Sequence, residues 1–409
     1  MLVAFSLENY KSFRERQVLS FASSIGDEHP EHIVTLANGL RVNRFAALIG
    51  GNGVGKTQLI NAITEFANSI HSDTLHKLHM PFLLNKECRN KPTSYEAILI
   101  DEEQKNFVRY GVSVLNEVIV DEYLYIRPIR KSAREQCIFI RNENGLVFKK
   151  PDLKKYESLI NPVLRESGAV VTFAKSLEID ALVETQRWAL KQLPYYSEKF
   201  KNPSLKFVEG QLKRQLSGEE GNEKLNESGQ RILNTYNEMV IQSPLHIDKV
   251  EFVRFGEDNE YKFVYLIKND DGDFTRIGPD RRDEFFSQGT LNVLTFLAIL
   301  IWASEYDFTL YVDEIDSSIH YSLASALIKK IFDKTCRKNG VQFIMSTHNI
   351  PLLDDVFRRD ELNIIVKDSS KASIITNATV FSVRKDAKVS AKYLRGEFGL
   401  VPAFLDIKN

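Results

Sequence analysis

Cysteine, excess charge and long apolar runs are all scarce in this chain. The three cysteines, at positions 88, 137 and 336, lie far apart with no C-x-x-C spacing, which excludes a disulfide framework and a zinc site built from cysteines. The 54 basic and 55 acidic residues give a net charge of −1, so the chain has little general attraction to nucleic acid, and contact with DNA would need a local basic patch. No stretch approaches about 18 uninterrupted apolar residues, and the first residues lack the basic segment of a secretion signal. We therefore expect a cytoplasmic protein without membrane spans.

The patterning divides the 409 residues into three regions. Residues 1–148 carry short apolar runs bounded by turns, which predict strands at 3–7, 18–21, 45–49, 95–100, 108–114 and 123–126. Residues 149–243 are rich in Lys, Glu, Gln, Leu and Asn and predict helices at 177–193 and 229–240. Residues 244–409 begin with a hairpin over 250–267 and then alternate helices with short apolar strands. The expected fold is α/β, with a mixed sheet and an inserted, mainly helical lobe.

The most informative motif is the glycine-rich run from Gly50 to Thr57. It satisfies G-x-x-x-x-G-K-[ST], and an apolar run at 45–49 and a helical apolar pattern at 59–70 flank it, as a phosphate-binding loop requires. Glycines let backbone amides approach phosphate oxygens, Lys56 reaches the β- and γ-phosphates, and the Thr57 hydroxyl binds Mg²⁺. The alternative is a glycine-rich turn without a ligand. The predicted nucleotide-binding residues are Gly50, Asn52, Gly53, Gly55, Lys56 and Thr57.

Two further motifs follow short apolar strands near the end of the chain. Asp313 and Glu314 come directly after the run at 308–312, at the strand end where ligands of parallel sheets bind. Asp313 suits a role at Mg²⁺, and Glu314 suits the base that polarises an attacking water, although a solvated acidic turn is the alternative. His348 follows the apolar run at 341–345 and is a candidate sensor of the γ-phosphate.

A third motif lies between these regions, at Ser287-Gln-Gly289-Thr290. It stands directly before an almost wholly apolar segment, residues 291–302, that predicts a buried helix. Serine and glycine at a helix N-terminus make an anion site, because free amides and the helix dipole both face the ligand. Alone the motif predicts no more than an N-cap. Its order, after the phosphate loop and before the paired carboxylates, makes Ser287 and Gly289 candidate nucleotide contacts.

In sequence and order these motifs resemble the P-loop, signature, Walker B and switch-histidine motifs of ABC-type ATPases of the SMC, RecF and OLD lineage. The segments 7–13 and 393–399 look like the first strand of that lineage and a C-terminal segment of its stand-alone OLD/RloA-like ATPases. The likeness covers residues 1 to about 120 and about 245 to the end. The signature here is S-Q-G-T rather than L-S-G-G-Q, and His320 follows Ile319 where transporter-type relatives carry Asp after Leu.

The resemblance implies an ATPase that uses ATP and Mg²⁺, with Thr57 and Asp313 at the metal and Glu314 and His348 in catalysis. Two subunits would meet head to tail, so that Ser287 and Gly289 of one cap the ATP on the P-loop of the other. The region 149–243 would form a projecting lobe for dimer or partner binding.

Two classes of function remain open. One is a sensor or scaffold ATPase of prokaryotic antiphage defence, similar to the ATPase subunit of the PARIS system. Such a subunit would respond to a phage trigger protein and control a separately encoded effector such as a TOPRIM-type nuclease, because too few residues follow His348 for a nuclease domain. The other is a RecF- or SMC-like repair ATPase that clamps DNA directly. A basic run from Arg127 to Arg141 would suit contact with nucleic acid or an acidic partner, although a solvated strand edge explains it somewhat better.

Overall fold

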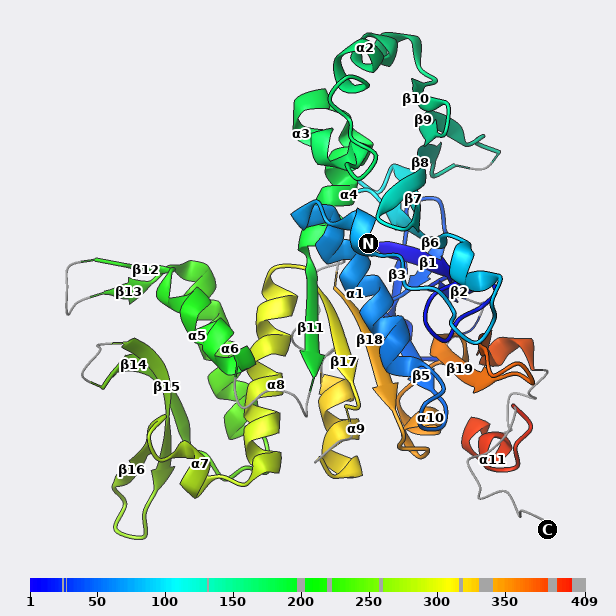
Figure 1. Ribbon diagram of the computed structural model, residues 1–409. Helices are drawn as coiled ribbons and strands as arrows, with labels where there is room; N and C mark the ends of the chain where they lie inside the picture. The colour runs from blue at the N-terminus through cyan, green and yellow to red at the C-terminus, as the bar shows by residue number, and fades with distance from the viewer. Residues whose placement is uncertain are drawn as a thin grey trace. The chain divides into compact units, whose positions relative to one another are not determined.

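The computed structural model describes residues 1–23, 26, 28–130, 132–196, 203–218, 223–256, 260–315, 319–330, 341–381 and 388–398. The chain divides into two compact units, which are described here one at a time. The first unit comprises Met1–Pro194 and Gln342–Asn409, and the second comprises Tyr195–Val341. Both contain helices and strands (Figure 1), so the predicted α/β class is confirmed. The three-part division at residues 148 and 243 stays a prediction.

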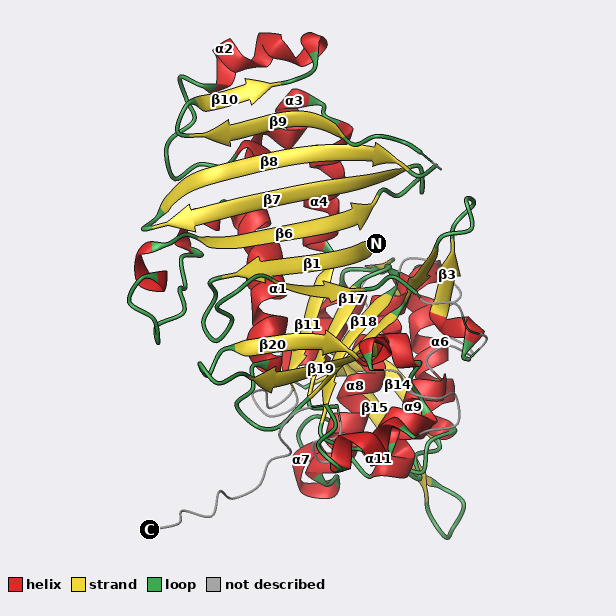
Figure 2. Cartoon of the chain, turned by 90° about the vertical axis from the view of Figure 1, so that its right-hand side faces the viewer, coloured by secondary structure: helices red, strands yellow, loops and turns green. Residues whose placement is uncertain are grey.

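An antiparallel sheet of seven strands dominates the first unit (Figure 2). Alternating buried and less buried side chains along its long strands explain the apolar pattern of the sequence. In spatial order the strands are β10 (Gly145–Phe148), β9 (Gln136–Asn142), β8 (Val118–Pro128), β7 (Asn106–Leu115), β6 (Thr93–Ile100), β1 (Leu2–Glu8) and β2 (Gln17–Ser20).

Phe66 lies in the core between this sheet and two helices, its own helix α1 (Lys56–Ser72) and α4 (Asp180–Leu190). Its ring centroid lies 5.5 Å from that of Tyr95, 6.1 Å from that of Tyr110 and 6.3 Å from that of Trp188. Aromatic groups at such separations bury large apolar areas and add specific packing. The helix that follows the phosphate loop is therefore fixed against the sheet by its apolar face.

A second group of strands in this unit positions the phosphate loop. Strand β5 (Phe45–Ile49) is buried along its whole length and runs parallel to β18 (Gln342–Thr347) and to β19 (Leu362–Lys367). Strand β20 (Ser373–Asn377) pairs with β19 in the antiparallel sense, so the predicted mixed sheet is present. The carboxyl ends of three parallel strands thus meet at one edge, which is where ligands of such sheets bind.

Short elements complete the first unit. They are β3 (Ile33–Thr35), β4 (Arg41–Asn43), α2 (Glu157–Ile160), α3 (Ala174–Leu177), α10 (Leu352–Asp355), α11 (Val389–Leu394) and the 3-10 turns η1 (Pro30–His32), η2 (Leu75–Lys77), η3 (Cys88–Asn90), η4 (Pro151–Tyr156), η5 (Val170–Phe173), η7 (Arg359–Glu361) and η8 (Ala378–Val380). Strand β11 (Gln192–Tyr196) runs across the boundary between the units.

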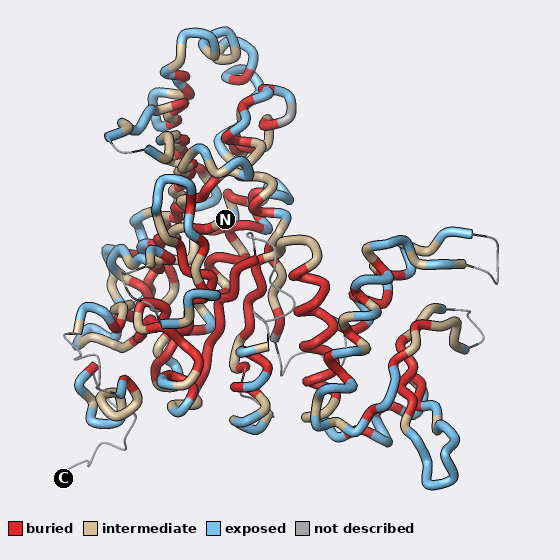
Figure 3. Tube along the Cα trace, turned by 180° about the vertical axis from the view of Figure 1, so that it is seen from behind, coloured by how far each residue is buried: buried red, intermediate tan, exposed pale blue. Residues whose placement is uncertain are grey.

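Helix α8 (Gln288–Glu305) forms the core of the second unit and is buried from Leu291 to Ser304 (Figure 3). Two amphipathic helices, α5 (Pro203–Lys213) and α6 (Glu227–Ile241), pack against it. The Tyr236 hydroxyl of α6 donates to the carbonyl oxygen of Leu294, and lies 2.9 Å from the Tyr265 hydroxyl. An all-round apolar helix needs this cover, because each of its faces would otherwise meet water.

The remaining elements of the second unit are mostly strands. They are β12 (Leu216–Ser217), β13 (Lys224–Leu225), the antiparallel sheet of β14 (Lys249–Phe255), β15 (Glu260–Lys268) and β16 (Phe274–Ile277), then α7 (Arg282–Phe285), β17 (Thr309–Asp313) and α9 (Tyr321–Lys330). None of the helices in the described ranges has the length and apolarity that crossing a membrane requires.

Some expected elements differ from those observed. The helix expected at 177–193 is wrong at both ends: α4 covers Asp180–Leu190, and β11 begins at Gln192. The hairpin at 250–267 is confirmed as β14 and β15, and the turn after it leads to a third strand, β16, that the short run at 274–277 does not predict. The helix 229–240 is confirmed as α6.

Candidate nucleotide-binding site

The phosphate loop lies where the sequence predicts, between buried strand β5 and helix α1. Gly50 follows the strand, and Gly55, with φ of +116°, is the residue before the first turn of the helix. The first amides of a helix have no partner within the helix and carry the positive end of its dipole. The loop therefore presents donors of the kind that bind phosphate oxygens.

Two glycines of the loop are required by close contacts. A Cβ at Gly50 would lie 2.3 Å from the carbonyl oxygen of Ile365, and one at Gly55 would lie 2.8 Å from Ser12 Oγ. Both positions also have positive φ, which glycine adopts without strain. Gly53 has φ of +72° but open space around it. Close contacts therefore require glycine at positions 50 and 55, and the positive φ alone favours glycine at position 53.

Serine and lysine side chains hold the loop from its side. Ser373 Oγ donates to the carbonyl oxygen of Val54, lies 2.7 Å from Ser12 Oγ and accepts from Lys367 Nζ at 2.9 Å. Burial lowers the pKa of Lys367, with Asp368 opposing that change. These contacts connect β20 and the turn after β1 to the loop.

Lys56 is buried, and its side chain folds back onto the phosphate loop. Its Nζ donates to the carbonyl oxygens of Gly50 at 2.9 Å and Gly51 at 3.0 Å. The ammonium group is thus held among the loop carbonyls, beside the amides that would bind phosphate. Thr57, one residue further along α1, is exposed, as are Asn52 and Gly53.

His348 lies beside the phosphate loop. Because β18 and β5 are parallel neighbours, with Thr347 opposite Ile49, the residues after both strands emerge together. A pocket of about 310 Å³ is lined by Gly50, Gly51 and Asn52 on one side and by Thr347, His348 and Asn349 on the other. Two motifs almost 300 residues apart in sequence therefore share one pocket.

Helix α11 supplies lining residues that sequence reasoning missed. Tyr393 and Leu394 line the same pocket. Ser390 fixes this helix, since its N–H donates to Asp354 Oδ1 at 3.2 Å and its hydroxyl donates to Asp354 Oδ2. The family-like segment 393–399 pointed to this region, but no pattern linked it to a nucleotide.

The signature residues lie in the second unit. Ser287 is the N-cap of α8, and its Oγ accepts from the Thr290 N–H at 3.2 Å, as the simple N-cap interpretation predicts. Ser287 is exposed and Gly289 is half-buried. The start of α8 is thus at the surface although most of the helix is buried, an arrangement compatible with a contact to another molecule.

The two carboxylates also lie in the second unit, at the carboxyl end of β17. Asp313 is the last residue of the strand, and Glu314 follows with φ of +55°. A non-glycine residue with positive φ is uncommon, and such conformations gather at functional sites. Both residues are half-buried. The structure places the pair at a strand end as predicted, and the neighbouring residues 316–318 lie outside the described part of the chain.

The basic run that favoured DNA contact is partly internal. Arg141 is buried, with its Nη1 3.5 Å from Glu122 Oε2 and its Nη2 donating to the carbonyl oxygen of Arg165 at 2.9 Å. Arg127 lies over the Phe107 ring at 4.8 Å. Lys131 lies outside the described residues. Part of this run therefore serves the sheet rather than an exposed basic surface.

Comparisons with known proteins place the chain in one family. The sequence model described as "AAA domain, putative AbiEii toxin, Type IV TA system" matches residues 45–355, more than half of the chain. Among solved structures, the SMC head domain from Thermotoga maritima is 14% identical over 92% of this chain and 98% of that chain, with a TM-score of 0.41. No curated protein is significantly similar to the chain.

Proposed function

Since the chain belongs to this AAA-domain family of P-loop ATPases, we propose that it binds and hydrolyses ATP to control a separately encoded effector in a prokaryotic defence system. The observation that carries the nucleotide part is the pocket in which the phosphate loop and His348 meet. Amide donors at a helix N-terminus, a buried lysine and a histidine at neighbouring strand ends suit a triphosphate.

The residues divide the proposed chemistry among them. The loop amides and Lys56 would bind the β- and γ-phosphates, and His348 would contact the γ-phosphate from the next strand. Thr57 and Asp313 would hold Mg²⁺, which supplies charge neutralisation when bound. Glu314 would accept a proton from, or polarise, the attacking water. The oxygen donors on Thr57 and Asp313 fit a hard cation of this kind.

We further propose that the complete site forms between two copies of the chain. Ser287 stands exposed at the N-terminus of an 18-residue helix, and Gly289 follows it without a side chain. Free amides there would cap the phosphates of ATP bound to a partner's phosphate loop. Bound ATP would then stabilise the dimer, and its hydrolysis would let the two subunits dissociate.

The regulatory role draws support from several sides. The description of the matched family names a putative toxin and a type IV toxin–antitoxin system. The order of the motifs resembles that in OLD/RloA-like and PARIS ATPases. A net charge of −1 and a buried Arg141 favour a protein partner over a DNA clamp. The effector would be a nuclease of TOPRIM type, a phage protein would be the trigger, and the protein would act in the cytoplasm.

Two substitutions test this function. Lys56→Ala should abolish ATP binding, because it removes the charge that compensates the phosphates. Glu314→Gln should keep ATP affinity and lose turnover by about 10²-fold or more, because an amide cannot accept a proton. Isothermal titration and phosphate release measure the two effects. Equal ATP affinity of Lys56→Ala and the wild type would defeat the nucleotide assignment.

The same variants test control of the effector. With the native operon expressed and ATP present, Glu314→Gln should change the yield of the co-purified effector, while Lys56→Ala should give the yield of the nucleotide-free wild type. DNA binding is measured in parallel over a salt series, because a clamp loses affinity steeply as salt rises. Tight, salt-sensitive DNA binding with no protein partner would favour the repair alternative.

A further inference from the structure

A histidine–glutamate cluster lies in the first unit, at η1 and just before β3. His29, Glu31 and His32 each offer one ligand atom, and these atoms lie within 4.8 Å of one another. His29 Nδ1 is 3.2 Å from Glu31 Oε1, and His32 Nε2 is 3.8 Å from the same oxygen. Ligands of a tetrahedral metal with bonds of about 2.0–2.1 Å stand about 3.3 Å apart. Both distances to Glu31 Oε1 are close to this spacing, and the ligand atoms of the two histidines lie within 4.8 Å of each other.

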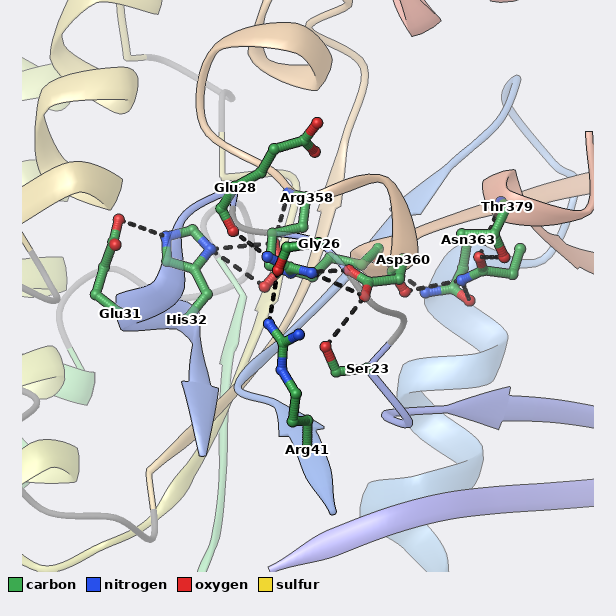
Figure 4. Close-up of polar contacts among 12 residues, drawn as sticks. Ser23, Gly26, Glu28, Glu31, His32, Arg41, Arg358, Asp360, Asn363 and Thr379 are labelled. Atoms are coloured by element: carbon green, nitrogen blue, oxygen red, sulfur yellow. Dashed lines mark hydrogen bonds and ion pairs between the residues drawn. The ribbon is translucent and has the colours of Figure 1, made fainter. Parts of the chain in front are cut away.

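A buried carboxylate orients one of these histidines from behind. His32 is 2% exposed, and its Nδ1 lies 3.1 Å from both carboxylate oxygens of Glu361. Its other nitrogen, Nε2, faces Glu31 (Figure 4). In metal sites a carboxylate on the second nitrogen fixes the tautomer and the direction of a histidine ligand. Glu361 has this position.

The carboxylate is itself held in place. Glu361 Oε2 accepts from the Arg358 N–H at 2.8 Å, and Glu361 is 0% exposed. Arg358 Nε pairs with Asp360 Oδ1 at 3.0 Å, and its Nη1 donates to the carbonyl oxygen of Glu28. Arg358, at the start of η7, therefore holds the backbone at Glu28, directly before the cluster.

More contacts fix the segment that leads into the cluster. Ser23 Oγ lies 3.2 Å from Asp360 Oδ2, and Arg41 Nη2 donates to the carbonyl oxygen of Gly26 at 2.7 Å (Figure 4). Pro30 restricts the backbone between the two histidines. Such support reduces the entropy that a ligand set loses when it binds an ion.

We propose that His29, Glu31 and His32 form a binding site for a divalent transition metal, with Zn²⁺ as the preferred ion. Two imidazole nitrogens and one carboxylate oxygen suit zinc, and three protein ligands leave a fourth position for water or another ligand. Glu31 is 45% exposed and His29 33%, so an ion reaches the cluster from solvent while His32 anchors it. The bound ion would tie η1 to the turn at η7, independently of the nucleotide.

The test uses the untagged full chain, freed of metal and nucleotide with EDTA and then titrated with ZnCl₂ in excess Mg²⁺. The wild type should bind one Zn²⁺ per chain and unfold at a higher temperature with zinc than without it. His29→Ala and Glu31→Gln should weaken zinc binding at least about tenfold and lose the thermal shift. Glu361→Gln should weaken binding about 10- to 100-fold, because Glu361 does not contact the ion but orients its ligand His32.

His71→Ala is the matched control, since this exposed histidine lies in the same unit and outside the cluster. It should bind zinc as the wild type does, which shows that removing an exposed histidine outside the cluster does not by itself weaken zinc binding. Unchanged ATP affinity shows that His29→Ala is folded. The proposal is overturned if the wild type binds no zinc, or if His29→Ala and the wild type bind zinc equally.

Discussion

Gly55 lies where two serine hydroxyls pack closely against the phosphate loop. A Cβ there would meet Ser12 Oγ at 2.8 Å and Ser373 Oγ at 2.9 Å, and φ is +116°. The two serines also contact one another, and Ser373 contacts the Val54 carbonyl oxygen, so a shift of Ser373 would break both of these contacts. Local conformation and distant packing therefore demand the same residue.

We predict that Gly55→Ala lowers ATP affinity at least about tenfold and destabilises the fold by about 1–3 kcal/mol, through backbone strain and displaced serines. Gly39→Ala is the control, because Gly39 has φ of +82° in open space outside the loop. It should cost about 1 kcal/mol and leave ATP affinity unchanged. Urea unfolding and ATP titration measure both variants, and wild-type affinity in Gly55→Ala would contradict the steric argument.

Between elements, Glu122 ties the seven-stranded sheet to the segment that follows it. This carboxylate of β8 is 0% exposed and accepts from the Tyr110 hydroxyl at 2.9 Å and from the Val170 N–H at 2.8 Å. Burial raises the pKa of Glu122 above its ordinary value of 4.5, while the Val170 N–H and Arg141 oppose the rise. The folded chain therefore keeps a proton at pH values where the unfolded chain has released it.

From that difference we predict the sign of a pH effect. As the pH rises from 4.5 toward the raised pKa, the contribution of Glu122 to the free energy of unfolding should fall, because the unfolded state binds fewer protons there. Glu122→Gln should remove this slope, and Glu122→Leu should cost about 3–5 kcal/mol at neutral pH, because it removes the buried carboxylate beside the Arg141 charge. Urea unfolding over a pH series measures the free energy of unfolding of each variant. Glu143→Gln, at an exposed glutamate, is the control. Identical slopes in wild type and Glu122→Gln would refute the assignment.

Among the elements, the sequence predicts those whose structure is determined by residues close together in the chain. Strand β5, the loop after it and buried helix α8 each carry their apolar pattern and their glycine or serine within a short segment, so all three were predictable. The contacts of Ser373 with Ser12 and of Glu361 with His32 join residues more than 300 positions apart. No local period records such a contact, and the same holds for Tyr393 in the nucleotide pocket.

The motifs are distributed over the whole molecule. The phosphate loop and His348 belong to the first unit, whereas Ser287 and the pair at Asp313 and Glu314 belong to the second. A head-to-tail pair would hold two equal sites, each with a phosphate loop from one copy and a capping serine from the other. Loss of the loop and loss of the cap should then complement each other between subunits.

We predict that Ser287→Arg leaves ATP binding to an isolated subunit intact but blocks hydrolysis and ATP-driven association, because a bulky cation fills the capping position. Lys56→Ala alone should also be inactive. Mixed at equal amounts, the two variants should recover up to about half of wild-type hydrolysis, since only mixed dimers form with ATP and each keeps one of its two sites intact. Ser158→Arg, at an exposed serine of α2, is the control and should hydrolyse ATP normally. If verified mixed dimers show no recovery at any ratio, the capping role of Ser287 is wrong.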